Sequence, residues 1–202
     1  MFTGIIQALG RVRSVSERGG DLRLCIDAPE IDPARLALGD SVAVAGVCLT
    51  VVERLAGGFA ADVSRETLAL TTVAQWRSGQ ALNLEPALRA GDPMGGHLVS
   101  GHVDGLAHLV SSRAEARSQR LCWRATPELL RFIATKGSVA LDGVSLTVNE
   151  VSAAEFAVNL IPYTLQVTTL GQLAVGGQVN LEIDPIARYT ARLLESGGAP
   201  AR

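Results

Sequence analysis

Short apolar runs separated by Gly, Asp and Pro dominate the sequence. The clearest runs of the first half are rich in Val, Leu, Ile and Phe, and they span residues 22–28, 41–53, 59–64 and 81–85. Runs of this length and composition are typical of β-strands. The tail differs, because Ile186, Tyr189, Leu193 and Leu194 recur at helical spacing. The pattern predicts a series of strands that ends in one helix.

The second half of the chain repeats the first at a constant offset. The segment Gly46–Val51, GVCLTV, returns as GVSLTV at Gly143–Val148, and 143 − 46 gives an offset of 97 residues. The same offset joins Cys25 to Cys122 and joins the two Asn-Leu-Glu triplets, at 83–85 and 180–182. Because the offset persists from the start of the repeated unit to its end, it indicates a duplicated domain.

Each copy is expected to form a small all-β barrel. A unit of about ninety residues with several short strands leaves many edges unpaired unless the sheet closes on itself. We therefore expect tandem barrels over residues 1–90 and 94–185, each with a short helical turn at its TLALTT or TLQVTTL sequence. The hinge between them is expected in 87–96, where Gly and Pro concentrate. A C-terminal α-helix over 186–197 completes the predicted architecture.

Composition and charge exclude several classes of function. Hydrophobic residues make up 48% of the chain and charged residues 19%, with a formal net charge of -2, which is typical of a folded domain. Lys and Arg are scattered, so the basic stripe of a nucleic-acid binder is absent. No apolar run approaches the roughly 20 residues of a membrane span, and the first residues do not resemble a secretory signal. We therefore expect a cytoplasmic protein that binds neither nucleic acid nor membrane.

The cysteines and histidines do not form a metal motif. Cys25, Cys48 and Cys122 lack the paired spacing of a disulfide framework or a zinc site, so we expect free thiols, with Cys25 and Cys122 packed in the cores. His97 and His102 are five residues apart in the bridge GGHLVSGH, without a carboxylate partner. This spacing does not suggest a metal site.

Four motifs carry a resemblance to a known family. They are the opening MFTGII, the pair GVCLTV and GVSLTV, the bridge GGHLVSGHVDG and the segment NLIPYTLQVTTLG. In this order and spacing they resemble the α chains of riboflavin synthases, which consist of two lumazine-binding repeats. The resemblance covers nearly the whole chain. It implies two tandem six-stranded Greek-key barrels and a C-terminal helix that assembles a homotrimer.

The same resemblance implies a reaction. Two molecules of 6,7-dimethyl-8-ribityllumazine would bind at each site, and one would transfer four carbons to the other. The products would be riboflavin and 5-amino-6-(ribitylamino)uracil. No metal or redox cofactor is implied, and lumazine synthase is a candidate partner besides the substrate and riboflavin.

A dismutation of two identical molecules needs two similar pockets that are not chemically equal. A duplicated domain supplies the two pockets, so the informative positions are those where the copies differ while their neighbours agree. Each such pair joins positions 97 residues apart, and the pairs are Phe2 and Val99, Ile5 and His102, Cys48 and Ser145, Asp62 and Asn159, and Glu66 and Tyr163. These differences are expected to assign the donor and acceptor roles.

The candidate catalytic residues are Cys48, His102, Ser145 and Thr147. Among them, His102 is the side chain that titrates near neutral pH, and the others offer hydroxyl or thiol groups for hydrogen bonding or nucleophilic attack. The residues expected to bind substrate, from the repeated motifs and from the resemblance, are Phe2, Gly4, Ile5, Ile6, Ser41, Cys48, Leu49, Thr50, Asp62, Val63, Ser64, Thr67, Gly101, His102, Val103, Lys136, Ser145, Leu146, Thr147, Leu160, Ile161, Pro162, Tyr163, Thr164 and Leu165.

Three further residues are less well determined by the sequence. Asp184 is a weaker candidate carried over from the family. His97 is compatible with either a structural or a functional role, because the Gly-rich bridge around it allows a ligand to approach the backbone closely. A structural or solvated role is expected for His108.

Two alternative functions compete with catalysis. The same repeats occur in fluorescent proteins that only hold a lumazine or flavin, and the retained Cys48, His102, Ser145 and Thr147 argue against this alternative. A flavin-binding reductase also uses a small Greek-key barrel, yet no Gly-rich nucleotide fingerprint follows a βαβ pattern here.

The first copy departs from the family pattern at two positions. Ala45 stands before the GVCLTV motif where Asn is expected, whereas the second copy has Asp142. Ser64 stands where a larger residue is common. We expect the first pocket to lack one polar contact and to be looser than the second.

Overall fold

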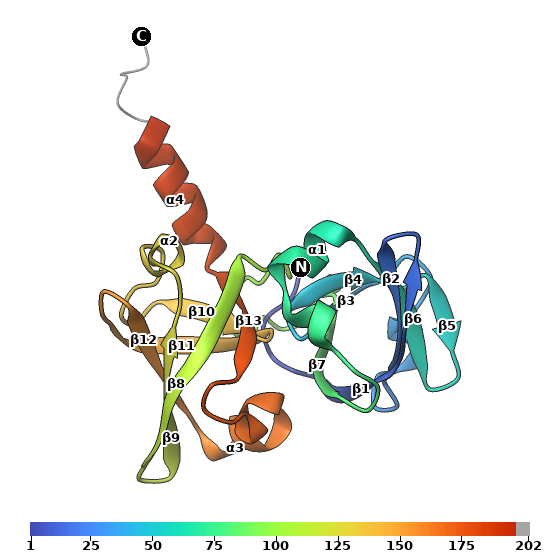
Figure 1. Cartoon of the computed structure of the whole chain (residues 1–202), viewed down its shortest axis with the longest axis horizontal. Helices are drawn as coiled ribbons and strands as arrows, with labels where there is room; N and C mark the ends of the chain where they lie inside the picture. The colour runs from blue at the N-terminus through green and yellow to red at the C-terminus, as the bar shows by residue number, and fades with distance from the viewer. Residues whose placement is uncertain (197–202) are drawn as a thin grey trace.

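The structure is a computed structural model that describes residues 1–196, and it consists of two β-barrels side by side with a helix projecting from the second (Figure 1). The strands of the first barrel are β1 (Ala8–Arg18), β2 (Asp21–Asp27), β3 (Ser41–Val44), β4 (Val47–Thr50), β5 (Glu53–Leu55), β6 (Gly58–Val63) and β7 (Ala81–Pro86). Those of the second are β8 (Gly105–Glu115), β9 (Ser118–Arg124), β10 (Ser138–Leu141), β11 (Val144–Val151), β12 (Glu155–Leu160) and β13 (Gln178–Ile183).

Short helices connect the strands, and one longer helix follows the last strand. The α-helices are α1 (Arg65–Leu70), α2 (Pro127–Leu130), α3 (Pro162–Val167) and α4 (Pro185–Ser196), and the 3-10 helices are Pro33–Arg35, Thr72–Gln75 and Thr169–Gln172. The predicted helical turns thus form at the two TLALTT-like sequences. Gly197, the last residue of the predicted C-terminal helix, lies outside the described residues.

The strand order identifies both units as Greek-key barrels. The second is a closed barrel with the order β10-β11-β12-β9-β8-β13. The first runs β4-β3-β7-β1-β2-β6-β5, and its two outer strands, β4 and β5, are consecutive in the chain. Strands β4 and β5 together correspond to the single strand β11 of the second barrel, because the chain of the first barrel leaves the strand conformation at Val51 and Val52. At this interruption, Val52 N–H donates to the Ala60 carbonyl at 2.9 Å. The predicted duplicated barrel fold is confirmed, and the extra strand in the first copy arises from this interruption.

Each barrel closes around its own apolar core. Apolar residues alternate along the strands, so that every second side chain points into the core. Phe59 in the first barrel and Phe156 in the second are buried in this way, at equivalent positions of the two copies. A third, smaller cluster is shared by both barrels, and it consists of Phe2, Ala43, Val99 and Ala140. The two barrels are therefore joined by packed apolar side chains as well as by the connecting chain.

The repeated glycines of the two hairpin turns lie where the barrels meet. A β-carbon on Gly46 would lie 2.6 Å from the backbone nitrogen of Gly143, and one on Gly143 would lie 2.9 Å from that of Gly46. The side chains of Asn83 and Asn180 each donate to a backbone carbonyl of the opposite turn, at 2.9 and 2.8 Å. The contact is reciprocal, so the duplication in sequence is matched by a quasi-twofold arrangement in space. Only glycine allows the two backbones to approach so closely.

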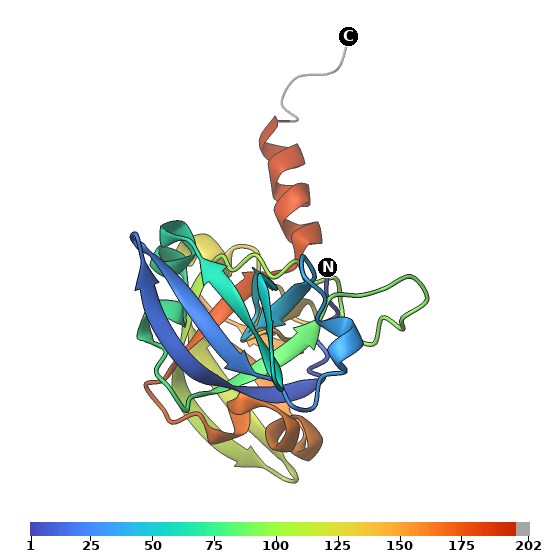
Figure 2. The same cartoon turned by 90° about the vertical axis from the view of Figure 1, so that its right-hand side faces the viewer.

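Helix α4 leaves the second barrel and extends away from both domains (Figures 1 and 2). Its first turns are anchored by Arg188, whose guanidinium pairs with the Asp104 carboxylate at 2.9 Å. The side chains of Ile186, Tyr189 and Leu194 are 69%, 68% and 77% exposed. The helix therefore presents apolar side chains that this chain does not cover. No helix among residues 1–196 is long and apolar enough to span a membrane.

Candidate active site

The segment that precedes each barrel crosses over to the other barrel. The Gly4 carbonyl accepts a hydrogen bond from Ser145 N–H on β11 at 2.8 Å, and the Gly101 carbonyl accepts one from Cys48 N–H on β4 at 2.9 Å. Beyond these glycines, Ile6 packs against the core of the second barrel. By the same exchange, residues from both repeats build each of the two predicted pockets.

We name the two pockets by their differing side chains. The Cys48 half-site comprises Cys48–Thr50 on β4 and the crossing segment Gly101–Val103. The Ser145 half-site comprises Ser145–Thr147 on β11 and the crossing segment Gly4–Ile6. Within each pair the cross-strand hydrogen bond fixes the register of the segment on the strand.

Glycine is required at both crossing points. Gly4 and Gly101 have φ values of 74° and 76°, a left-handed conformation that other residues rarely adopt. A β-carbon on either one would lie 2.6 Å from the β-carbon of Ser145 or Cys48, respectively. Substitution there would displace the segment that carries Ile5 or His102.

In the Cys48 half-site, the thiol lies between the inter-barrel cluster and solvent. Cys48 is half-buried and packs against the cluster that contains Phe2. Thr50 follows two residues later on the same face of β4 and is exposed, and His102 on the crossing segment is also exposed. The Cys48 N–H to Gly101 carbonyl hydrogen bond therefore places His102 one residue from a backbone contact with the strand that carries Cys48 and Thr50.

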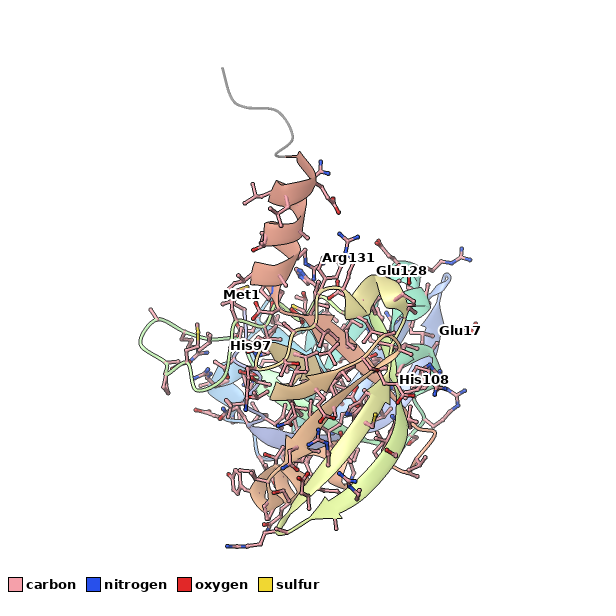
Figure 3. All side chains as sticks on the ribbon, turned by 90° about the vertical axis from the view of Figure 1, so that its left-hand side faces the viewer. Met1, Glu17, His97, His108, Glu128 and Arg131 are labelled. Atoms are coloured by element: carbon pink, nitrogen blue, oxygen red, sulfur yellow. The ribbon has the colours of Figure 1, made fainter. Side chains whose placement is uncertain are left out.

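The Ser145 half-site contains a histidine that has no counterpart in the other. His97 Nδ1 lies 2.7 Å from Ser145 Oγ, and its backbone N–H donates to the Thr3 carbonyl at 3.1 Å, next to the N-terminal segment (Figure 3). Its Nε2 is buried and has no hydrogen-bond partner among the described residues. Burial lowers the pKa of His97, and the Asp184 carboxylate opposes this effect. The imidazole is therefore neutral at pH 7.

The signal for His97 was present in the sequence but is easily missed. The pairs of equivalent positions begin at Phe2 and Val99, and His97 precedes the second member of that first pair. The comparison of equivalent positions in the two copies therefore does not include His97. Its hydrogen bond to Ser145 depends on the crossing of the chain, which the offset does not reveal.

Residues 62–67, predicted to contact the ligand, lie at the end of β6 and the start of α1. Asp62 binds the Arg23 guanidinium with both carboxylate oxygens, at 2.5 and 3.1 Å. Ser64 begins α1, where its hydroxyl accepts from Thr67 N–H at 3.4 Å. Ser64 thus has a capping role that a larger apolar residue would not supply.

The matching segment of the second barrel, 160–165, has a different surface. Asn159, which replaces Asp62, is partly buried, and its Oδ1 has no partner among the described residues. At the start of α3, the side chains of Ile161, Pro162 and Tyr163 are exposed, and those of Thr164 and Leu165 are half-buried. This barrel therefore presents more apolar surface beside its half-site than the first barrel does.

The remaining candidates divide by burial and by position. Side chains that point into the cores leave only their backbone for a ligand, and they are Phe2, Leu49, Val63, Leu146 and Leu160. Ser41 lies opposite Thr50 on β3, so it belongs with the Cys48 half-site. Lys136 is exposed at a turn of the second barrel with a φ of 67°, and its backbone N–H donates to the Val148 carbonyl at 2.8 Å.

Two buried carboxylates complete the site and were not among the sequence-based candidates. Glu85 on β7 accepts from the N–H groups of Thr3 and Gly4, and Glu182 on β13 accepts from those of Ser100 and Gly101. The available signal was the acidic residue at the end of each Asn-Leu-Glu triplet, inside an otherwise apolar strand. A charged residue buried in the same place of both copies points to a specific partner.

Comparison with known proteins agrees with this architecture. The family described as Lumazine binding domain matches residues 3–87 and again residues 100–184. Riboflavin synthase of Brucella abortus (strain 2308) is 50% identical over 200 residues, which cover 96% of this chain and 98% of that protein. Riboflavin synthase of Photobacterium phosphoreum is 42% identical over 194 residues, which cover 96% of this chain and 89% of that protein.

A solved structure shows the same fold with a bound ligand. LumP complexed with riboflavin is 26% identical and has a TM-score of 0.80, over 91% of this chain and 99% of that chain. The match spans both barrels. Together with the duplicated family match and the full-length relatives, it places the chain in one family. The chain carries two lumazine-binding domains and belongs to the riboflavin synthase family.

Proposed function

We propose that this protein makes riboflavin from two molecules of 6,7-dimethyl-8-ribityllumazine. One molecule transfers four carbons to the other, and the second product is 5-amino-6-(ribitylamino)uracil. The observation that carries the proposal is the pair of half-sites, which share one backbone frame and present different reactive groups. Two identical substrates thereby meet two unequal environments.

Each half-site is proposed to bind one lumazine ring. The backbone groups of Gly4–Ile6 and Gly101–Val103 supply donors and acceptors that match the edge of the heterocycle. Thr50 and Thr147 are equivalent and exposed, so they suit a shared task such as holding the ring or the ribityl chain. Holding two rings together replaces an encounter in solution by a step within one complex, which is worth several kcal/mol of barrier.

The reactive side chains are proposed to move protons and to provide a nucleophile. One ring loses a proton from its C7 methyl group, and the other accepts a nucleophile at C7. In the Ser145 half-site, neutral His97 takes the hydroxyl proton of Ser145 at Nδ1. In the Cys48 half-site, Cys48 and His102 perform the corresponding tasks.

The complete active site is proposed to form between chains of a homotrimer. A groove of about 610 Å³ lies along α4, with walls that include Phe132, Ala187 and Leu194. The exposed side chains of Ile186 and Tyr189 add apolar surface elsewhere on the same helix. Burial of this surface would stabilise an oligomer. The first barrel of one chain then faces the second barrel of another, so that a Cys48 half-site meets a Ser145 half-site. A cytoplasmic location and a complex with lumazine synthase are further parts of the proposal.

The test is turnover of purified protein with 6,7-dimethyl-8-ribityllumazine alone. Riboflavin absorbance should appear without any added cofactor, and the uracil product should form in equal amount. His102→Ala and Cys48→Ser should slow turnover while leaving the fold intact by circular dichroism. Tight binding of the lumazine without turnover would instead identify a chromophore carrier.

A further inference from the structure

We propose that Glu85 and Glu182 are positioning residues, each of which holds the crossing segment of one half-site in its ligand-binding conformation. The inference rests on the proposed function for the identity of the ligand, but its geometry is independent of turnover. Glu182 serves the Cys48 half-site through Gly101, and Glu85 serves the Ser145 half-site through Gly4. Each carboxylate belongs to the repeat whose leading segment it holds.

The hydrogen bonds converge on the segment just before each half-site. Glu85 Oε1 accepts from both the backbone N–H and the hydroxyl of Thr3, at 2.7 and 2.6 Å, and its Oε2 accepts from Gly4 N–H at 2.9 Å. Glu182 accepts from Ser100 N–H at 2.6 Å and from Gly101 N–H at 2.9 Å. Two neighbouring N–H groups of an extended segment are thus captured by one carboxylate.

The captured segment is the same one that pairs with the opposite barrel. The Gly101 N–H donates to Glu182, while the Gly101 carbonyl accepts from Cys48 N–H. The next residue is His102, whose side chain is exposed in the half-site. Gly4 is held in the same two directions by Glu85 and Ser145. The carboxylate therefore acts on the residues proposed to meet the ligand through the backbone of the crossing segment.

A carboxylate is needed because every group aimed at it is a donor. An ionised carboxyl group only accepts, whereas an amide of the same shape would turn one NH₂ group toward the backbone N–H groups. Both glutamates are buried, at 3% and 2% exposure, and the described residues show no salt bridge to either. Backbone N–H groups and, for Glu85, the Thr3 hydroxyl are therefore their immediate partners, rather than a counter-ion.

The charged surroundings of the two glutamates differ. Burial raises the pKa of both groups, and it raises the pKa of Glu182 to about 7, helped by the nearby Asp104 carboxylate and opposed by Arg188 of α4. Near Glu85, the positive N-terminal amine opposes the rise in pKa. The hydroxyl of Thr3 adds a third donor that Glu182 lacks. The Cys48 half-site is therefore held by the weaker of the two anchors.

The experiment compares Glu85→Gln and Glu182→Gln in the full-length protein, with Glu17→Gln on the exposed end of β1 as the matched control. The lumazine and riboflavin are titrated separately, and the stoichiometry per chain is measured by calorimetry. Each of the two variants should keep one tight site and bind about tenfold to hundredfold more weakly at the other, since losing a hydrogen bond to a charged acceptor has effects of this size. The control should bind as the unchanged protein does.

Alkylation assigns the lost site. Bound ligand should protect the Cys48 thiol from iodoacetamide in the unchanged protein and in Glu85→Gln, but not in Glu182→Gln, with Cys25 and Cys122 as internal references in the mass spectrum. Thermal unfolding separates positioning from a general loss of fold, because each positioning variant should keep a folded, tight second site.

The inference is wrong if both variants bind two ligands with unchanged affinity, or if each weakens both half-sites equally. In either case the carboxylates act only on the stability of the chain. Failure of the proposed function would look different, because the unchanged protein would then bind two lumazines per chain and make no riboflavin. The binding and protection results would still decide the role of the glutamates.

Discussion

The Cys48 and Ser145 half-sites share a frame and differ in the groups attached to it. Both have a left-handed glycine on a crossing segment, a hydrogen bond from that glycine to a strand of the other barrel, and a buried glutamate behind it. They differ in the thiol or hydroxyl on the strand, and in the position of the histidine. Under the proposed function, the duplication has kept the groups that hold a ligand and has changed the groups that react with it.

The two histidines reach their half-sites by different routes. His102 lies on the crossing segment itself, at the position that Ile5 occupies in the other half-site. His97 precedes that segment and bonds to Ser145. A single linker between the barrels therefore supplies one histidine to each half-site.

The largest effect is expected from removing the oligomer contact, because it separates the half-sites of different chains. The double variant Tyr189→Glu with Leu194→Glu should be monomeric, folded and without measurable turnover, since two charges on the exposed face of α4 oppose its burial. Light scattering and the riboflavin assay measure this together. A monomer that turns over would show that the two half-sites of one chain suffice.

The next largest effect is expected at His97, which bonds to Ser145 in the Ser145 half-site. His97→Ala should lower kcat by about 10²-fold, the usual contribution of a positioned acid or base, while KM changes little. Ser145→Ala should have a similar effect, and the double variant should be no slower than either single one, because both act through one hydrogen bond. Independent, additive losses would contradict a shared role.

The sequence predicted the duplicated barrels better than the contacts within the two half-sites. The offset of 97 gave the duplication, the barrels and the repeated glycines, because pairing and turns follow local rules. It did not give the exchange of crossing segments, which brings Gly4 to Ser145 and Gly101 to Cys48. This exchange decides which residues of one repeat lie next to residues of the other. The contacts of His97, Glu85 and Glu182 could therefore not be predicted from the sequence. The break at Val51 was also missed, since its letters continue the strand pattern.

The equivalent hairpin turns of the two barrels, at Ala45 and Asp142, are expected to differ in how they make stability depend on pH. Burial raises the pKa of Asp142 to about 7, whereas Ala45 in the first copy has no ionisable group. An unfolded Asp has a pKa of about 3.9, so between these values the folded chain binds more protons, and stability falls as pH rises through the window. Asp142→Asn should remove this fall, which is about 4 kcal/mol for a pKa raised from about 3.9 to about 7, and the neutral amide keeps an acceptor for Asn180 N–H.

Chemical unfolding at several pH values between 4 and 8 measures the effect. The variant and the parent should have similar stability at the acid end and diverge toward pH 8, with the variant the more stable. The slope that remains is expected from Glu182, whose pKa is also raised to about 7. A variant that loses stability equally at all pH values would show that the charge of Asp142 is not the cause.

The smallest effect is expected from making the first turn resemble the second. Ala45 has a φ of 44°, which costs an ordinary L-residue roughly 1–2 kcal/mol, whereas Asn and Asp tolerate this conformation. Ala45→Asn should therefore raise the free energy of unfolding by about 1 kcal/mol, and Asp142→Ala should lower it. Denaturant titration at pH 4, where the Asp142 carboxyl is protonated in the folded chain, measures both. Because Ala45 is buried beside the Gly46 and Gly143 contact, a loss of stability would mean that space between the barrels, rather than backbone strain, selects alanine there.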